Sequence, residues 1–172
     1  VCLFMPLYRK IKDGDFKLEP TGVEFTLPIG DVDYTGRVRK SLLTGSNVPV
    51  YFIENDPFFY REGMYAPPGS TTGDYDDNSS RFVFFSRGCI EAIIRLGIRP
   101  DVIHCHDWQA GLVPVYLKSH YAFEPAVARA ATLFTVHNLG YQGLFWHWDM
   151  KLTGLDWSYF TAAQLEYYGK IN

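Results

Sequence analysis

The sequence has 172 residues and a net charge of −3, and 47% of its residues are hydrophobic while 20% are charged. This composition is typical of one globular domain with a sizeable core, which excludes disordered and fibrous proteins. Acidic and basic residues are interspersed without a basic run, a pattern that argues against nucleic acid or an anionic membrane as partner. No apolar stretch reaches the ~20 residues of a membrane span, so we expect a soluble protein.

The cysteines and the chain ends add two expectations. Cys2, Cys89 and Cys105 lie in segments that read as strand or helix, and an odd number so placed does not suit a disulfide framework. A reducing, cytoplasmic location fits best. The sequence does not begin with Met, opens inside a strand-like run and stops after Asn172 without a closing signal. We therefore expect a fragment of a longer protein.

Apolar runs in the first part of the chain predict strands. Residues 1–5 form a continuous apolar run, as in a strand covered on both faces. Residues 23–27 and 48–53 are further strand-like runs, and residues 34–43 read as a more polar strand or hairpin arm. Residues 56–77 are rich in Pro, Gly, Tyr and acidic residues, which predicts a long irregular loop that is functional or mobile.

Helices and strands alternate after this loop. Apolar residues recur at three- and four-residue steps from Phe82 to Leu96, which predicts a helix. Asn78 and Ser79 are its capping candidates, and Gly97 ends it. The elements that follow are a buried strand at 101–106, a helix at 111–121 with Pro114 in its first turn or at a kink, a strand at 132–136 and a short helix at 157–168. This alternation predicts an α/β domain with a parallel, Rossmann-like sheet.

Polar side chains follow two of the predicted strands. Ligands bind beyond the carboxyl ends of strands in open parallel sheets, so both places are candidate sites. Imidazole, carboxylate and amide groups suit sugar hydroxyls, and an aromatic ring such as Trp108 or Tyr141 suits the C–H face of a sugar. The candidates are His104, His106, Asp107 and Trp108 after the first strand, and His137, Asn138, Gly140, Tyr141, Gln142 and Gly143 after the second.

Several alternatives stay open for these residues. His104 and His106 lie two apart on a strand and face the same way, which suits a metal-dependent hydrolase as well as a pair of ordinary core histidines. Asp107 could be only a helix N-cap. The glycines that follow His137 favour a ligand close to the backbone there.

Two further groups of residues are interpreted as structural. Trp146, Trp148 and Trp157 read as core or interface aromatics. The acidic residues 74–77 read as a solvated loop near a helix start, without a metal role.

Two segments carry a family resemblance: Arg-Pro-Asp-Val-Ile-His-Cys-His-Asp-Trp-Gln-Ala-Gly-Leu at 99–112 and Phe-Thr-Val-His-Asn-Leu-Gly-Tyr-Gln-Gly at 134–143. Through them the sequence resembles the bacterial glycogen synthase and plant starch synthase family. The order also matches at Tyr-Arg-Glu-Gly-Met-Tyr (60–65), Asp-Asn-Ser-Ser-Arg-Phe (77–82) and Leu-Glu-Tyr-Tyr-Gly-Lys-Ile-Asn (165–172). The resemblance therefore covers nearly the whole chain.

The resemblance implies the N-terminal half of a GT-B glycosyltransferase that extends α-1,4-glucan from ADP-glucose or UDP-glucose, ADP-glucose being the expected donor. Residues 1–172 would form a partial N-terminal domain, without the C-terminal nucleotide-binding domain and without the Lys-Thr-Gly-Gly loop of the family. No metal or cofactor besides the nucleotide sugar is implied. The family's location is the cytoplasm, or the plastid in a plant.

The resemblance also implies roles for individual residues. His137 and Asp107 would hold the donor glucose and act in catalysis, with Asn138 beside them. Tyr65 would approach the cleft. The strand-end argument adds His106, Gly140 and Tyr141 as substrate-binding candidates. We expect the fragment alone to transfer no glucose, and the alternative function is a non-catalytic module that binds α-glucan or a nucleotide sugar.

Overall fold

The first part of the chain forms a four-stranded sheet. The computed structural model describes residues 1–71 and 73–172. Its strands are β1 (Leu3–Pro6), β2 (Glu19–Ile29), β3 (Val32–Leu42) and β4 (Pro49–Glu54), in the order β1-β4-β3-β2. β1 and β4 are parallel, and β2 and β3 form a long antiparallel hairpin. All four predicted strands are confirmed, although β2 and β3 extend beyond their predicted bounds and β1 is only partly buried.

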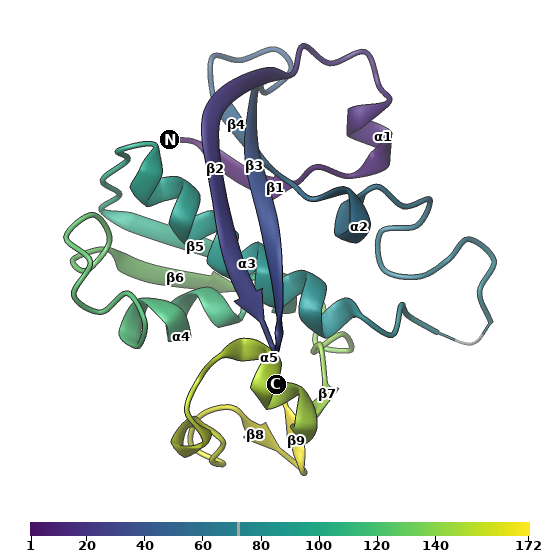
Figure 1. The fold of residues 1–172 in the computed structure, drawn as a ribbon, viewed down its shortest axis with the longest axis vertical. Helices are drawn as coiled ribbons and strands as arrows, with labels where there is room; N and C mark the ends of the chain where they lie inside the picture. Colours follow the sequence, from purple (N-terminus) through teal and green to yellow (C-terminus); the bar gives the residue numbers. More distant parts are fainter. Residues whose placement is uncertain (72) are drawn as a thin grey trace.

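Helix α3 (Asn78–Arg95) lies at the centre of the molecule, between this sheet and the second half of the chain (Figure 1). Its apolar side chains supply both main core clusters, Phe84 in the first and Ile90 in the second. The helix is confirmed, but its N-cap is Asp77 instead of Asn78 or Ser79. The short helices α1 (Arg9–Lys12) and α2 (Asp56–Phe59) precede it, and α2 occupies the start of the predicted loop.

The parallel βαβ unit predicted after α3 is also present. It consists of β5 (Val102–His106), the 3-10 turn η1 (Trp108–Ala110), α4 (Leu112–Lys118) and β6 (Ala131–Thr135), with β5 and β6 parallel. Pro114 lies in the first turn of α4, as expected. The prediction of a fully buried strand at 101–106 is wrong. Ile103 and Cys105 face the core beneath α3 and α4, whereas the opposite face of β5 is exposed.

The C-terminal part is a small subdomain below α3 in Figure 1. It contains β7 (Phe145–Trp146), η2 (His147–Asp149), α5 (Met150–Thr153), η3 (Trp157–Tyr159), β8 (Glu166–Tyr167) and β9 (Lys170–Ile171). The helix predicted at 157–168 is wrong: only one 3-10 turn forms, and the chain then enters the β8–β9 hairpin, because Tyr168 and Gly169 both adopt positive φ and reverse it.

Three further observations concern the exposure of the tryptophans, the state of the cysteines and the search for membrane-spanning helices. Trp146, Trp148 and Trp157 are 53%, 53% and 54% exposed, which contradicts the core alternative of their interpretation, while the interface alternative stays a prediction. The three cysteines are free. Among the described residues, no helix combines the length and the apolar character needed to cross a membrane.

Candidate active site

Asp107 and His137 meet where β5 and β6 end. The Asp107 carboxylate accepts a hydrogen bond of 2.7 Å from the backbone N–H of His137 and one of 2.9 Å from its Nδ1. The Asp107 backbone N–H donates to the carbonyl of Thr135. Asp107 has φ 56°, a region that non-glycine residues seldom adopt, so the strained backbone aims its carboxylate across to the next strand.

The hydrogen bonds fix the orientation of the His137 ring and the ionisation of Asp107. The backbone N–H of His137, followed by its side chain, holds the pKa of Asp107 below its usual range. Because the carboxylate is ionised and only accepts, Nδ1 of His137 must carry the proton. In the neutral form of the ring, Nε2 is then an acceptor, on a side chain that is 58% exposed. The pair presents an oriented hydrogen-bonding nitrogen to solvent.

Two more histidines lie beside this pair. The ring centroids of His104 and His106 are 4.0 Å apart, and the His106 ring stacks on His137 at 5.3 Å. Nε2 of His104 is 2.7 Å from the hydroxyl of Thr135. Desolvation, aided by His104 and His137, lowers the pKa of His106, which favours a neutral ring.

The same geometry addresses the metal alternative. Of the residues that the structure describes, no group of three or more His, Cys, Asp or Glu side chains is arranged to hold a metal ion.

Trp108 forms an aromatic wall next to Asp107. Its ring packs edge-on against Phe82 at 4.8 Å and lies 5.7 Å from Phe145 and 6.1 Å from Tyr65. Gly143 has φ 61° and lies against the Trp108 ring, so that a Cβ at this position would lie 2.5 Å from the indole. Only glycine therefore lets the loop after β6 lie flat on Trp108.

Tyr65 is held in place by the first turns of α3. The Asn78 side chain donates to the Tyr65 carbonyl at 2.9 Å, and Arg81 donates to the carbonyls of Met64 and Phe58. Arg81 is fully buried, and burial, followed by the charge of Arg61, lowers its pKa. The buried guanidinium of Arg81 fixes the Tyr65 loop, because any movement of the loop would leave the N–H groups of Arg81 buried without hydrogen-bond acceptors.

The loop after His137 is shaped by its own side chains. The Asn138 Oδ1 accepts from the backbone N–H of Gly140 at 2.9 Å, and a Cβ on Gly140 would lie 3.2 Å from that oxygen. Tyr141 is 71% exposed and projects from this loop. Asn138 thus builds the turn after His137.

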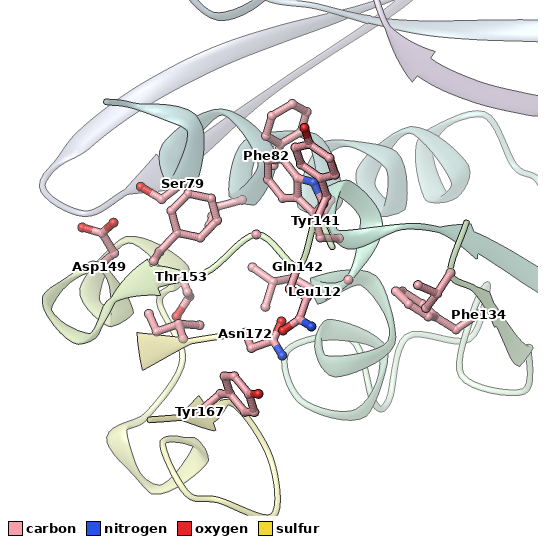
Figure 2. A pocket seen from close by; sticks show the side chains of 18 of the residues that line it. Ser79, Phe82, Leu112, Phe134, Tyr141, Gln142, Asp149, Thr153, Tyr167 and Asn172 are labelled. Atoms are coloured by element: carbon pink, nitrogen blue, oxygen red, sulfur yellow. The ribbon is translucent and has the colours of Figure 1, made fainter. Parts of the chain in front are cut away.

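A cavity of about 480 Å³ opens beside this loop (Figure 2). Trp108, Tyr141, Gln142 and Gly143 line it together with apolar residues of α3 and β6 and with Tyr167 and Asn172 of the C-terminal subdomain. A second cavity, about 440 Å³, shares these loop residues and reaches Gly140 and Asp74. Asp107, His137, His106, Asn138 and Tyr65 line neither cavity, whereas Trp108, the residue after Asp107, lines both.

The structure thus brings most predicted site residues to one edge. His106, Asp107, His137 and Asn138 lie together, and Tyr65 reaches them through Trp108. Sequence reasoning missed Arg81 and the cavity residues from the end of the chain. The available signal for Arg81 was a charged residue directly before the apolar run 82–85. Tyr167 and Asn172 lie in the segment 165–172 that matches the family order, but nothing in that segment marked them as cavity residues, since their place depends on the tertiary fold.

Comparison with known proteins supplies the family. A family model described as the starch synthase catalytic domain matches residues 1–172. The chain belongs to this family. Its relatives include a glycogen synthase of Syntrophotalea carbinolica, 41% identical over 172 residues, and glycogen synthase 2 of Geobacter metallireducens, 40% identical. In both cases the match covers 100% of this chain and 34% of the relative.

The fold comparison gives the same family. The catalytic domain of starch synthase IV from Arabidopsis thaliana, bound to ADP and acarbose, matches with a TM-score of 0.83 and 26% identity. The match covers 100% of this chain and 34% of that one. The predicted α/β fold of the N-terminal half of a GT-B glycosyltransferase is confirmed. This member of the starch synthase catalytic domain family spans about a third of the length of its relatives.

Proposed function

We propose that the full-length protein is a retaining glucosyltransferase that extends α-1,4-glucan from ADP-glucose, and that residues 1–172 form part of its N-terminal domain. The observation that carries the proposal is the Asp107–His137 pair, held at 2.7 and 2.9 Å beside an aromatic wall, in a chain of the starch synthase catalytic domain family. A domain that binds the nucleotide would come from the rest of the protein. The cytoplasm is the proposed location, consistent with the three free cysteines.

The proposed reaction breaks the bond between glucosyl C1 and the diphosphate and forms a bond from C1 to the acceptor 4-hydroxyl, whose proton is released. Charge on the leaving diphosphate and on the glucosyl ring develops together, so positioning and electrostatics supply most of the rate enhancement. His137 would hold a glucosyl hydroxyl through Nε2. Asp107 would fix the tautomer of His137 and help to stabilise positive charge on the glucosyl ring. Asn138, His106, Gly140, Tyr141 and Tyr65 would bind substrate around this pair.

A resident cofactor or metal has no part in this proposal beyond the nucleotide-sugar donor. Support for ADP-glucose comes from the starch synthase IV neighbour, which is bound to ADP and acarbose. Acarbose in that neighbour also supports an α-glucan acceptor.

Transfer of labelled glucose to glycogen by the purified full-length protein tests the proposal. We expect incorporation from ADP-glucose, slower incorporation from UDP-glucose, and none by residues 1–172 alone, because the leaving diphosphate needs groups from outside this chain. Glycogen binding by the full-length protein without any transfer would support the alternative of a non-catalytic binding module. Transfer by the 172-residue chain would contradict the proposal that groups from outside this chain are needed at the leaving diphosphate.

A further inference from the structure

Arg81, in the first turn of α3, is fully buried and uses all three nitrogen atoms of its guanidinium. Nε donates to the carbonyl of Phe58 at 2.7 Å, Nη1 donates to Oδ1 of Asn78 at 2.6 Å, and Nη2 donates to the carbonyl of Met64 at 2.9 Å. The guanidinium therefore joins α3 to two points of the chain that precedes it, helix α2 and the residue before Tyr65.

These contacts fix the backbone on both sides of Tyr65. The Met64 carbonyl that Arg81 holds belongs to the peptide group before Tyr65, and the Tyr65 carbonyl belongs to the peptide group after it. This second carbonyl accepts from Nδ2 of Asn78 at 2.9 Å and from the backbone N–H of Tyr75 at 2.8 Å. Because each peptide group is planar, holding both groups fixes the two backbone dihedrals of Tyr65 and the direction of its side chain.

A second arginine braces this arrangement. The Tyr75 ring contacts two guanidinium groups, with Cζ of Arg61 4.7 Å and Cζ of Arg81 5.1 Å from the ring centre. Both Nη atoms of Arg61 donate to the Asp77 carboxylate, at 2.8 and 2.6 Å. Because Arg81 is fully buried within residues 1–172, its surroundings do not depend on what the rest of the full-length protein covers.

The needs of a folded core do not explain why this residue is an arginine. Burial lowers the pKa of Arg81, and the charge of Arg61 lowers it further, because both act against the charged guanidinium. Apolar side chains of similar volume can often replace buried charged groups without loss of stability. What the guanidinium adds is direction, since its donors lie in a rigid planar fork that matches acceptors at fixed positions.

Tyr65 extends this fixed geometry to the candidate active site. Its ring lies 6.1 Å from the Trp108 ring and 5.9 Å from the Phe82 ring, and Trp108 directly follows Asp107. Burial raises the pKa of Tyr65, and the negative charge of Asp107 adds to this shift. The phenol therefore stays protonated at neutral pH and can donate a hydrogen bond to a substrate oxygen.

We propose that Arg81 is a positioning residue for glucosyl transfer and acts through Tyr65. By holding the peptide groups on both sides of Tyr65, directly and through Asn78, it orients the Tyr65 hydroxyl toward the donor glucose. Arg81 is buried and does not itself meet the substrate. A displacement of the hydroxyl by about 1 Å is sufficient to cost about 100-fold in rate. The inference rests on the proposed function and adds to it a residue that sets the geometry of the site.

Kinetics of the full-length protein test the inference through Arg81→Lys. Lysine keeps the charge but offers one ammonium group instead of a planar fork, so it cannot bind all three partners in the same geometry. We expect kcat to fall about tenfold or more, with less than about a twofold change in the KM for glycogen, because Tyr65 lies beside the donor glucose.

Arg87→Lys is the matched control. Arg87 is also a buried arginine of α3 and also donates to a carbonyl, that of Pro28 at 2.8 Å, but this contact lies outside the Tyr65 loop. This variant should keep wild-type kinetics. An equal loss of kcat in Arg87→Lys would contradict the inference, because the loss would then follow from any exchange of a buried arginine in this helix.

A double-mutant cycle shows whether Arg81 acts through Tyr65. Tyr65→Phe removes only the hydroxyl and should lower kcat by about as much as Arg81→Lys. Adding Arg81→Lys to Tyr65→Phe should then change kcat less than about twofold, because the group to be positioned is already absent. Wild-type kcat in Arg81→Lys, or additive losses in the double variant, would overturn the inference.

Asn78→Asp decides if Arg81→Lys does not fold. Aspartate keeps an acceptor for Arg81 but cannot donate to the Tyr65 carbonyl. Asn78→Asp should lower kcat, and combining it with Tyr65→Phe should add no further loss. Wild-type kcat in Asn78→Asp, or an additive loss in its combination with Tyr65→Phe, would count against the positioning role.

Hydrogen exchange tests the positioning without turnover. The amide of Tyr75, which donates to the Tyr65 carbonyl, should exchange about tenfold faster in Arg81→Lys and at the wild-type rate in Arg87→Lys. Equal exchange of this amide in wild type and Arg81→Lys would contradict the positioning role. Absence of glucosyl transfer by the wild-type protein would instead count against the proposed function alone.

Discussion

Asp107→Asn in the full-length protein should lower kcat for glucosyl transfer about 100-fold or more while leaving the fold intact. Asparagine tolerates positive φ as well as aspartate does, and its carbonyl can still accept from the backbone N–H of His137. Its amide, however, would face Nδ1 of His137 with a donor. The proton would then move to Nε2, and the nitrogen that faces the site would change from acceptor to donor.

Asp101→Asn is the matched control for this experiment. Asp101 lies at the other end of the same strand, is exposed and contributes its backbone carbonyl to the bond with Ala131. It should retain wild-type kcat, and both variants should melt within about 2 °C of wild type. Near-normal turnover by Asp107→Asn would remove the Asp107–His137 pair from the catalytic machinery.

Gly143→Ala should destabilise the protein by about 2–4 kcal/mol and reduce transfer as well. Its Cβ would lie 2.5 Å from the Trp108 ring, which Phe82 and Phe145 hold from other sides, and its φ of 61° adds backbone strain. Either the loop after β6 lifts or Trp108 moves, and both displace the residues beside Asp107. Thermal denaturation of the full-length variant measures the effect.

Gly45→Ala separates the effect of the contact with Trp108 from the effect of backbone strain. Gly45 has φ 75°, but a Cβ there would meet nothing within 4 Å, so this variant should lose only about 1 kcal/mol from backbone strain. Equal melting temperatures for Gly143→Ala and Gly45→Ala would show that the contact with Trp108 does not constrain the loop.

The elements predicted best from the sequence are those whose pattern repeats over several turns or alternates strand with helix. Helix α3 combines a long apolar periodicity with a glycine stop, and the parallel β5–β6 pair follows from the strand–helix–strand spacing. The meeting of Asp107 and His137 was predictable because parallel strands end at one edge. Their hydrogen bonds were not predictable, since they depend on the positive φ of Asp107.

The errors come from tertiary context. The segment 157–168 has a helix-like composition, but Tyr168-Gly169 turns the chain into a hairpin. The strand at 101–106 is apolar enough to be buried, yet α3 and α4 pack on one of its faces only. The interpretation of Trp146 and Trp148 as core residues followed the general tendency of indoles to be buried, but both are exposed, and on β7 it is Phe145 that packs on Trp108.

The most direct test of the account is a crystal structure of the full-length protein with ADP-glucose, or a non-transferable analogue of it, in the cleft. The account predicts glucosyl hydroxyls within hydrogen-bonding distance of His137 Nε2, with the Asp107 carboxylate still bound to Nδ1 and the sugar next to the Trp108 wall. A glucosyl unit bound away from the rim formed by the ends of β5 and β6, with the Asp107–His137 pair making no contact to it, would contradict the account.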